Sequence, residues 1–387
     1  MTSLADWQQG GFGLYIHWPF CASKCPYCDF NSHVAGAVDQ TRWATAFVAE
    51  IQRAAAETPG RVLDTIFFGG GTPSLMHPDL VATIIDTARR AWPMRNDPEI
   101  TLEANPTSIE AGRFSAYRQA GVNRISMGMQ AMNDVDLRKL GRLHTAAEAM
   151  AAFDIARARF DRVNFDLIYA RQDQSLADWR AELTRALDLA VDHLSLYQLT
   201  IEDGTAFGAR HQAGGLLGLP DDDLSADMYA LTQDLTAARG IPAYEVSNHA
   251  KPGSESRHNL IYWRGGDYIG IGPGAHGRVT IGKTRWATEC PKGPDQWLTA
   301  VLETGLGELP RNALTHEDHA LEYLMMSLRL AEGMSIARYN SLSPAPLNMA
   351  QVVNLGDLGL LTHSNDKVAT TPQGRMVLNA IIRDLAA

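Results

Sequence analysis

Short apolar segments alternate with amphipathic ones from residue 14 to about residue 246 of the chain. Each apolar segment has the length of a buried strand, and each amphipathic stretch repeats its apolar residues at helical spacing. Strands that alternate with helices in this way form a parallel sheet with right-handed crossovers. The expected strands are Leu14–Trp18, Leu63–Phe68, Glu99–Ala104, Val122–Met129, Val163–Tyr169 and His193–Leu199, with a short seventh at Ala243–Val246. The expected helices are Gln40–Glu57, Pro78–Ala91, Ser108–Gln119, Thr145–Phe160, Ser175–Ala190 and Asp222–Arg239.

Six strand–helix units are fewer than the eight of a complete barrel. We therefore predict an α/β fold in which residues 1–250 form a partial (β/α)6 TIM-like barrel. An open, doubly wound sheet is the alternative. Residues 251–310 are rich in Gly and Pro, and they are expected to form a connecting region with strand-like pieces at Tyr268–Ile271 and Arg285–Ala287.

Residues 311–387 are expected to form a small α+β domain of winged-helix-like type. The pattern predicts helices at Glu317–Leu330, Val352–Leu360 and Pro372–Leu385, around a hairpin of Leu360–His363 and Lys367–Thr370. Such domains often bind DNA, but five Lys and Arg face seven Asp and Glu from Thr315 onward. The sign of this balance favours a docking module over a DNA-binding one.

The whole chain is acidic, with 34 Lys and Arg against 44 Asp and Glu and a net charge of −10. This balance argues against nucleic acid as a partner. The sequence has no apolar run of the length that spans a bilayer, which leaves only peripheral membrane contact open. Its N-terminal segment lacks the pattern of a secretion signal, so we expect a cytoplasmic protein.

Functional groups of a parallel barrel gather on the loops that follow the carboxyl ends of its strands. In this chain those positions carry a cysteine cluster, a glycine-rich turn and several polar side chains. They are Cys21, Cys25 and Cys28 after the first strand, Phe67–Ser74 after the second, and Glu103, Gln130 and Asp166 at or near the ends of the next three.

Three of the four cysteines lie close together in the pattern C-x3-C-x2-C, whereas Cys290 stands alone far downstream. Three thiolates on one loop can hold three corners of a cubic iron–sulfur cluster and leave the fourth iron open. A structural zinc site would normally need a fourth ligand and a second knuckle. A disulfide scaffold fits neither the odd number nor a reducing compartment. The cysteines therefore predict an iron–sulfur cluster.

The loop Cys21-x3-Cys25-x2-Cys28 resembles that of the radical S-adenosylmethionine superfamily. The stretches YIHWPFC, GGGTPS, RISMGMQ and HNLIYW, together with Glu103, resemble one branch of it from about residue 12 to the C-terminus. That branch contains oxygen-independent coproporphyrinogen III oxidase and its haem-chaperone relatives of the HemW type. The resemblance implies a [4Fe-4S] cluster whose open iron is chelated by S-adenosylmethionine, which reduction cleaves to methionine and a 5′-deoxyadenosyl radical.

The resemblance also implies which residues surround the cofactor. Residues matching the first S-adenosylmethionine site are Tyr15, Gly70 and Glu103. Residues matching a second S-adenosylmethionine site in the oxidase are Tyr27, Gly71, Thr72, Gln130, Arg142 and Asp166.

Two departures separate the chain from the oxidase and favour the haem-chaperone relatives. Phe30 stands where the oxidase pattern has a further cysteine, and only 20 residues precede Cys21. The stretch Arg257–Trp263 contains His258 in an H-N-x-x-Y-W motif that is linked to haem binding in the chaperone group. A hydrogen-bonding structural role for His258 stays open, and His249 is an unusual second imidazole nearby.

The expected function is therefore that of a haem chaperone that binds haem and passes it to an acceptor protein, such as a respiratory enzyme. The alternative is oxidative decarboxylation of coproporphyrinogen III to protoporphyrinogen IX. A radical enzyme for an unrelated substrate is a third, weaker reading.

Overall fold

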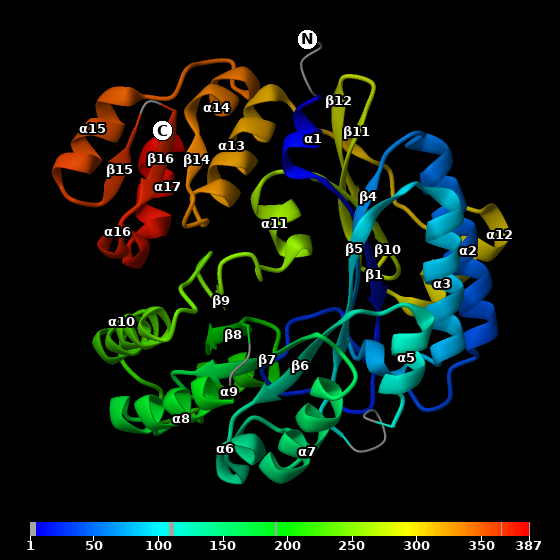
Figure 1. Cartoon of the computed structure of the whole chain (residues 1–387), viewed down its shortest axis with the longest axis horizontal. Helices are drawn as coiled ribbons and strands as arrows, with labels where there is room; N and C mark the ends of the chain where they lie inside the picture. The colour runs from blue at the N-terminus through cyan, green and yellow to red at the C-terminus, as the bar shows by residue number, and fades with distance from the viewer. Residues whose placement is uncertain (1–4, 108–111, 190–191, 365, 387) are drawn as a thin grey trace.

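The computed structural model describes residues 5–107, 112–189, 192–364 and 366–386. Its centre is an 11-stranded sheet in the order β13-β12-β11-β10-β1-β4-β5-β6-β7-β8-β9 (Figure 1). Consecutive parallel pairs join the strands β1 (Phe12–Trp18), β4 (Leu63–Gly70), β5 (Met94–Ala104), β6 (Arg124–Gln130), β7 (Arg162–Tyr169) and β8 (His193–Gln198). These are the six strands that the sequence predicts, and they confirm the partial parallel barrel.

Helices cover the outer face of the curved sheet (Figure 1). They are α2 (Gln40–Glu57), α3 (Pro78–Ala91), α5 (Phe114–Ala120), α7 (Ala146–Arg157), α8 (Leu176–Asp188) and α10 (Asp222–Ala238). The short helices α6 (Asp134–Lys139) and α9 (Ala206–Gln212) lie beside residues 26 and 27 of the cysteine loop. Local chemistry sets where several of them begin, because Thr145 and Ser175 form capping boxes and Asp39 accepts from two backbone amides. The first part of the helix expected at 108–119 and the end expected at residue 190 lie outside the described residues.

The Gly-rich region after residue 250 contributes strands to the same sheet. The strand β10 (Asp267–Ile271) runs parallel to β1, and β11 (His276–Ile281), β12 (Thr284–Glu289) and β13 (Asn312–Ala313) follow it in antiparallel order. A helix, α12 (Pro294–Thr304), packs on α2, where Trp297 stacks on Trp43 with 5.4 Å between the ring centroids.

At the other edge of the sheet, the prediction of a strand at Ala243–Val246 is wrong. Residues Asn248–Ala250 form the strand β9 and pair antiparallel with β8, while Ala243 makes only an isolated bridge to His249. Val246, the last residue of this stretch, instead packs on the apolar core of the C-terminal residues.

The stretch Arg257–Trp263 forms a helix, α11, and not the loop expected from its glycine-rich surroundings. Ser256 begins it by accepting a hydrogen bond from the backbone amide of Asn259. Its contacts are with the first residues of β1 and β4, so α11 lies at the amino ends of the parallel strands. The cysteine loop lies at the opposite, carboxyl ends.

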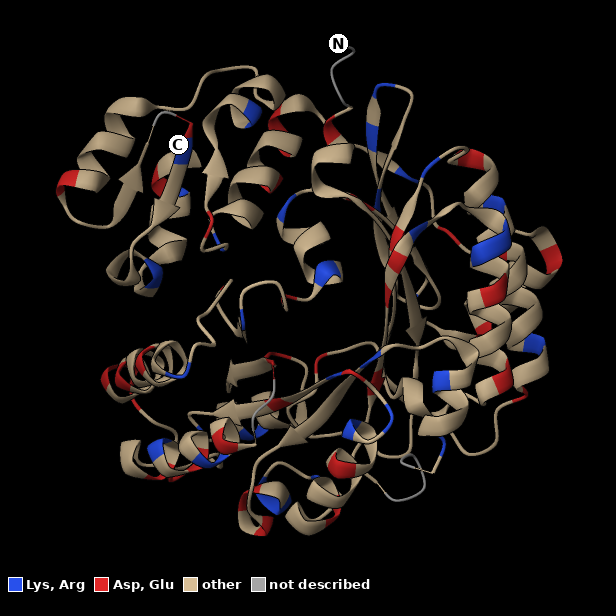
Figure 2. Cartoon of the chain, in the orientation of Figure 1, with Lys and Arg blue, Asp and Glu red and all other residues tan. Residues whose placement is uncertain are grey.

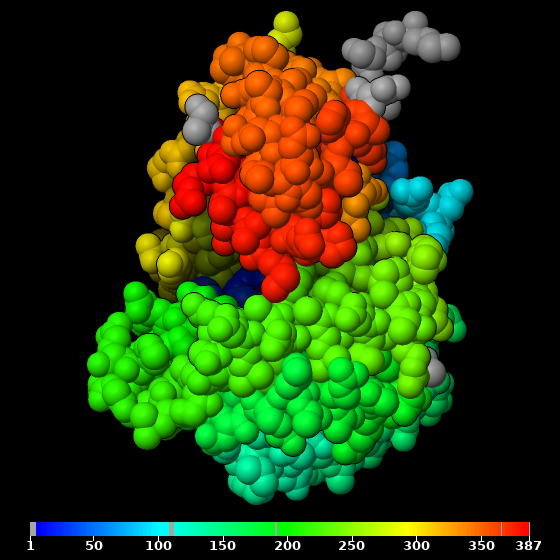
Figure 3. All heavy atoms as spheres, turned by 90° about the vertical axis from the view of Figure 1, so that its left-hand side faces the viewer, coloured from blue at the N-terminus to red at the C-terminus, as the bar shows by residue number. Residues whose placement is uncertain are grey.

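The C-terminal residues form a separate small domain with its own apolar core (Figures 1 and 3). Its elements are α13 (His316–Ser327), β14 (Met334–Ser335), α14 (Ile336–Leu342), α15 (Met349–Asp357), β15 (Leu361–His363), β16 (Lys367–Thr370), α16 (Pro372–Met376) and α17 (Leu378–Ala386). The expected hairpin is confirmed, whereas the expected last helix is divided at Val377. Acidic and basic residues are interspersed along this domain in Figure 2.

No helix in the described part of the chain is long and apolar enough to cross a membrane.

Candidate functional site

The three clustered cysteines lie on a loop that follows β1. The short strands β2 (Phe20–Cys21) and β3 (His33–Val34) pair in parallel and close this loop at its base. Within it, the backbone amide of Cys28 donates to the carbonyl of Cys25 over 3.1 Å, which folds the second half into a turn. All three thiols are free, and Cys21 is buried while the other two are half-buried.

Each thiol has a polar neighbour. Thr72 Oγ1 donates to Cys21 Sγ over 3.3 Å, and Arg142 Nη1 donates to Cys25 Sγ over 3.3 Å. Cys28 Sγ lies 3.8 Å from Ser32 Oγ. Burial raises the pKa of Cys21 and of Cys28, so without a cationic partner these thiols stay protonated.

The loop has room and donors for an iron–sulfur cluster. A Cβ atom on Gly71 would lie 3.0 Å from Cys21 Sγ and 2.8 Å from the carbonyl oxygen of Phe20, so only glycine leaves that approach open. Among the described residues, no three His, Cys, Asp or Glu side chains converge as the ligands of one metal ion. Thiols of a cubane bind separate irons and do not need to converge on one point. Cys21, Cys25 and Cys28 therefore suit a three-thiolate cluster.

Arg142 connects the cysteine loop to the strands. Besides Cys25, it donates to Asn105 Oδ1 over 2.6 Å and to the carbonyl of Gly128 over 3.2 Å. Asn105 in turn donates to Thr72 Oγ1 over 3.2 Å. The guanidinium thus links β5, β6 and the Gly-rich turn after β4 in one polar network. Sequence reasoning missed Asn105, although its place just after the end of β5 was a signal.

Two other residues of the second expected S-adenosylmethionine set lie near Arg142. Tyr27 is hydrogen-bonded to Cys25 and Arg142, and burial raises its pKa. Gln130 ends β6 with a φ of 69°, a left-handed conformation that non-glycine residues rarely adopt. Strain of this kind often marks a functional site.

Two carboxyl groups enter the interior from neighbouring strands. Burial, with a smaller contribution from the nearby Asp166, raises the pKa of Glu103 to about 8, against an opposing hydrogen bond from the backbone of Gly70. Burial also raises the pKa of Asp166 to about 6. Ser126 Oγ and Asn164 Nδ2 donate to Asp166 Oδ1 over 3.4 and 3.3 Å. At neutral pH Glu103 is therefore mostly protonated.

Tyr15 lies on β1 and faces the same interior. Its hydroxyl is 3.0 Å from Nδ1 of His17, whose Nε2 is 2.9 Å from the carbonyl oxygen of Asn31 in the cysteine loop. Burial raises the pKa of Tyr15, so its hydroxyl stays protonated. This chain of contacts connects the barrel interior to the cysteine loop.

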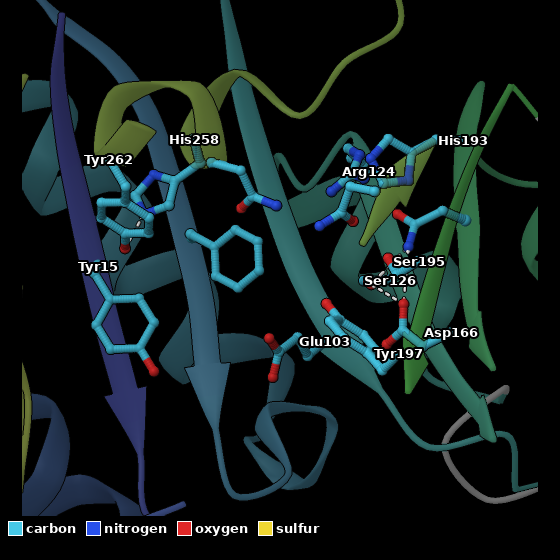
Figure 4. Close-up of a pocket in the computed structure, with 14 residues that line it drawn as sticks. Tyr15, Glu103, Arg124, Ser126, Asp166, His193, Ser195, Tyr197, His258 and Tyr262 are labelled. Carbon is cyan, nitrogen blue, oxygen red and sulfur yellow. Dashed lines mark hydrogen bonds between the residues drawn. The ribbon is translucent and has the colours of Figure 1, made fainter. Parts of the chain in front are cut away.

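The interior holds a cavity of about 200 Å³ (Figure 4). Sequence reasoning singled out four of its lining residues, Tyr15, Glu103, Asp166 and His258. Five more lie in the stretches Phe67–Ser74, RISMGMQ and HNLIYW that the sequence brought forward, namely Phe67, Arg124, Ser126, Asn259 and Tyr262. The missed lining residues are Asn164, His193, Ser195, Tyr197 and Asn248. Polar residues at alternate positions of β7 and β8 were the signal for most of these, because alternate residues of a strand share one face.

His258 lies at the end of this cavity that is remote from the cysteines. Its Nδ1 is 2.6 Å from Thr65 Oγ1 and its Nε2 is 2.6 Å from the hydroxyl of Tyr262. Burial lowers the pKa of His258 to about 3. Because both ring nitrogens have partners, axial ligation of haem iron would require one of these hydrogen bonds to break. This arrangement favours a structural role over the expected axial one.

The two remaining residues singled out in the sequence are both buried. His249 lies on β9, and burial lowers its pKa to about 3. Cys290 is 1% exposed, and burial raises its pKa to about 12. Neither is brought to the cysteine loop.

The sequence of this chain is similar to those of known proteins and protein families. Residues 15–184 match the radical SAM superfamily, and residues 314–377 match the HemN C-terminal domain. The heme chaperone HemW of Mycobacterium tuberculosis is 39% identical over 100% of this chain and 97% of its own length. The heme chaperone HemW of Escherichia coli is 39% identical over 95% of this chain and 96% of its own.

Two further proteins extend the comparison. The mitochondrial radical S-adenosyl methionine domain-containing protein 1 of Bos taurus is 36% identical over 96% of this chain and 86% of its own length. The structure of coproporphyrinogen III oxidase (HemN) from Escherichia coli superposes with a TM-score of 0.81 at 22% identity. That superposition covers 99% of this chain and 92% of the oxidase. At that identity, the oxidase shows a shared fold.

The partial barrel and its cysteine loop define a protein of the radical S-adenosylmethionine class. Within that class, the 39% identity to two HemW proteins over nearly their whole lengths identifies the family. The chain belongs to the HemW family.

Proposed function

We propose that this protein is a haem chaperone, which binds haem and transfers it to an acceptor protein such as a respiratory enzyme. The observation that carries the proposal is the 39% identity to two proteins named heme chaperone HemW over nearly their entire lengths. The expected cytoplasmic location stays a prediction.

We further propose that Cys21, Cys25 and Cys28 hold a [4Fe-4S] cluster and that S-adenosylmethionine binds beside it. When bound, this pair supplies reductive cleavage of a sulfonium. The contributions of the chain itself are to hold the thiolates and to exclude water. Arg142 stabilises negative charge on Cys25, and Thr72 does so on Cys21.

The proposed cofactor contacts comprise the two sets predicted from the sequence. Tyr27 belongs to the cysteine loop, three others line the cavity, and the Gly70–Gly71 backbone can approach a ligand closely. The proposed contacts are Tyr15, Gly70 and Glu103, with Tyr27, Gly71, Thr72, Gln130, Arg142 and Asp166.

The residue at position 30, and not the size of the cavity, supports the chaperone over the oxidase, because haem and coproporphyrinogen III both have a porphyrin-type ring. Pockets that enclose drug-sized ligands measure about 300–1,000 Å³, whereas this cavity measures about 200 Å³. A porphyrin macrocycle does not fit inside it without rearrangement of the barrel. Phe30, which replaces the further oxidase cysteine, is 65% exposed and offers no thiol beside the loop.

Two additions to anaerobically reconstituted protein test the proposal. Haem should bind and give a Soret band distinct from that of free haem, and spectroscopic titration measures this binding. Coproporphyrinogen III, with S-adenosylmethionine and a reductant, should yield no protoporphyrinogen IX in a chromatographic assay.

The control for both additions is the same protein in which Cys21, Cys25 and Cys28 are replaced by Ala. We expect haem binding to survive in it, because the proposal assigns these thiols to the iron–sulfur cluster and not to haem. Multiple-turnover decarboxylation by the wild-type protein, or the absence of saturable haem binding, would overturn the chaperone assignment.

A further inference from the structure

The side chain of Asn31 joins the cysteine loop to the segments that follow β10 and β12. Its Nδ2 donates to the backbone carbonyls of Pro273 and of Lys292, over 2.9 Å in each case. A Cβ atom on Gly274 would lie 2.6 Å from this nitrogen, so a glycine permits the close approach. Three segments that are far apart in the sequence therefore meet at the carboxyl ends of β1 and β10, and we call this place the Asn31 corner. The segments are residues 29–34, 272–276 and 290–293.

The corner carries an exposed imidazole, that of His276 at the beginning of β11. Both ring nitrogens of His17 and one of His33 are already bonded, whereas neither nitrogen of His276 has a partner in the described part of the chain. Burial lowers the pKa of His17, and the nearby His33 and His276 contribute to the decrease. The three rings are therefore neighbours, and the ring of His276 has both nitrogens available.

The neighbour of His276 across the sheet is an acidic residue. Glu289 on β12 lies opposite His276 in the register of the two strands, and side chains in such a pair stand close together. Metal-binding imidazoles commonly have a carboxylate beside them, which orients the ring and raises its basicity. His276 thus has the surroundings of a ligand for a metal ion, with a free nitrogen to bind it.

An exposed aromatic ring and two cations accompany this imidazole. Phe30 directly precedes Asn31 and is 65% exposed, although phenylalanine is normally buried. Lys24 and Lys292 are both exposed and form no ion pair with any described residue. Lys24 reaches the corner, because its Nζ lies 3.5 Å from the carbonyl oxygen of Ser32. The corner therefore combines an imidazole, an apolar ring and ammonium groups on one exposed surface.

We propose that haem binds at the Asn31 corner, with His276 as the axial ligand of its iron and Phe30 against the porphyrin. This inference rests on the proposed chaperone function and gives the haem a site outside the barrel. Imidazole is a common ligand of haem iron, and an aromatic side chain packs well on a flat apolar ring. The two propionates of haem pair with ammonium groups, which Lys24 and Lys292 supply.

His276→Gln is the decisive variant in a spectroscopic titration of the full-length protein with haem. We expect its haem affinity to fall at least tenfold, and its Soret band to move toward that of free haem. The matched control is His211→Gln on α9, because His211 is also exposed and its ring nitrogens have no partner among the described residues. That control should bind haem as the wild type does. In His276→Gly, added imidazole should restore the wild-type band, which a purely structural role would not allow.

Phe30→Ser separates packing from ligation. It removes an apolar contact and keeps the imidazole, so haem affinity should fall about tenfold while the Soret band stays in place. The matched control is Leu358→Ser, because Leu358 is 63% exposed and lies on the C-terminal domain. That control should leave haem affinity unchanged.

Lys292→Gln tests the pairing with a propionate. We expect weaker binding of haem and unchanged binding of iron protoporphyrin dimethyl ester, whose carboxylates are blocked. The control is Lys283→Gln, because Lys283 is exposed in the turn between β11 and β12, at the opposite end of these strands. It should affect neither probe.

A measurement on the wild-type protein needs no variant to fold. Diethyl pyrocarbonate modifies accessible imidazoles, and mass spectrometry of the peptides identifies which ones react. Bound haem should protect His276, while His211 and the exposed His363 on β15 should stay reactive.

Three results would overturn this proposal while the chaperone assignment stands. They are haem binding of wild-type strength by folded His276→Gln, full modification of His276 in the haem complex, and an equal loss of affinity in His211→Gln. The absence of saturable haem binding by the wild-type protein would instead overturn the chaperone assignment, and this proposal with it.

Discussion

At the scale of single residues, the four cysteines differ in what surrounds them. Cys21, Cys25 and Cys28 lie on one loop with polar neighbours, while Cys290 lies in the apolar core behind the sheet, 3.9 Å from the carbonyl of Gly270. Replacing any one of the first three by Ala should reduce bound iron from about four per chain to nearly none. Iron analysis and the visible absorption of anaerobically reconstituted protein measure this.

The matched control is Cys290→Ser, which should retain the full iron content. Loss of the cluster in this variant would show that the buried thiol is a fourth ligand, and the open-iron arrangement would then be wrong.

A second residue-scale prediction concerns pH. The pKa of Glu103 is about 8 in the folded protein against an ordinary value of 4.5. The folded state therefore holds the proton more tightly than the unfolded state, and this contribution to stability is lost as pH rises from about 4.5 to about 8. In Glu103→Gln the loss is absent, so the free energy of unfolding should fall by about 4 kcal/mol less than in the wild type between pH 5 and pH 9.

Denaturant unfolding at several pH values measures this difference. Asp166→Asn is the companion variant, because the pKa of Asp166 is raised only to about 6 and its effect should be complete at lower pH. Parallel pH profiles for Glu103→Gln and the wild type would show that Glu103 titrates normally.

What the sequence reveals about these residues depends on how local their arrangement is. The cysteine spacing predicts a cluster because all three ligands lie on one loop. Asn105 gains its role from Thr72 and Arg142 on other elements, and its place just after the end of β5 is its only local signal. The role of His258 was also non-local, since its partner Thr65 lies 193 residues earlier in the chain.

At the scale of elements, α11 closes the amino end of the barrel. Glu99 on β5 accepts from the backbone amide of His258 over 3.0 Å, and the imidazole bridges Thr65 and Tyr262. The ring also stacks on Phe67, with 5.0 Å between centroids. These contacts attach the helix to two strands, so the H-N-x-x-Y-W stretch is explained by packing at this end.

His258→Ala and Tyr262→Phe separate the structural role from haem ligation. Each removes a buried hydrogen bond, and we expect a loss of about 1–3 kcal/mol of stability in both. The Soret band and haem affinity should be unchanged in the folded variants. Thermal unfolding and haem titration measure the two effects. If His258 is instead the axial ligand, Tyr262→Phe frees Nε2 and strengthens haem binding, while His258→Ala abolishes it.

The elements that the sequence predicts well are those with a strong period of their own. The strands β1 and β4 to β8 carry such a period, and the helices α2, α3, α7, α8 and α10 add a capping side chain to theirs. The helix α11 has seven residues between glycine-rich segments, too few to show a helical period. Similarly, the sequence predicts β10 only as a strand-like piece of a connecting region, because its place beside β1 depends on a pairing across more than 250 residues.

At the scale of the whole molecule, the C-terminal domain is held on the barrel by arginines. Arg264 pairs with Glu332 over 2.7 Å, and Arg278 pairs with Glu322 over 2.6 Å. Arg375 Nη1 donates to the backbone carbonyl of Glu245 over 3.4 Å. This use of cationic side chains for docking agrees with the acidic balance of the domain, which argued against DNA binding.

Arg338 makes the most extensive of these contacts. It donates to both carboxylate oxygens of Asp6 over 2.6 and 2.9 Å and to the backbone carbonyls of Arg264 and Gly265. Its guanidinium also lies 4.5 Å from the ring centroid of Tyr323. One side chain thus joins the N-terminal helix α1 (Asp6–Gly10), the end of α11 and the C-terminal domain.

Arg338→Leu should therefore loosen the domain from the barrel. The variant leaves Asp6 and two carbonyls without their donor, and we expect a loss of about 3 kcal/mol because one partner of a largely buried pair is removed. Calorimetry should show a lower midpoint, and hydrogen exchange should increase at residues 6–10 and 257–263. The exposed Arg383, on α17 of the same domain, gives the control Arg383→Leu, which should change neither. Equal effects of the two variants would show that loss of positive charge, and not the loss of these contacts, destabilises the protein.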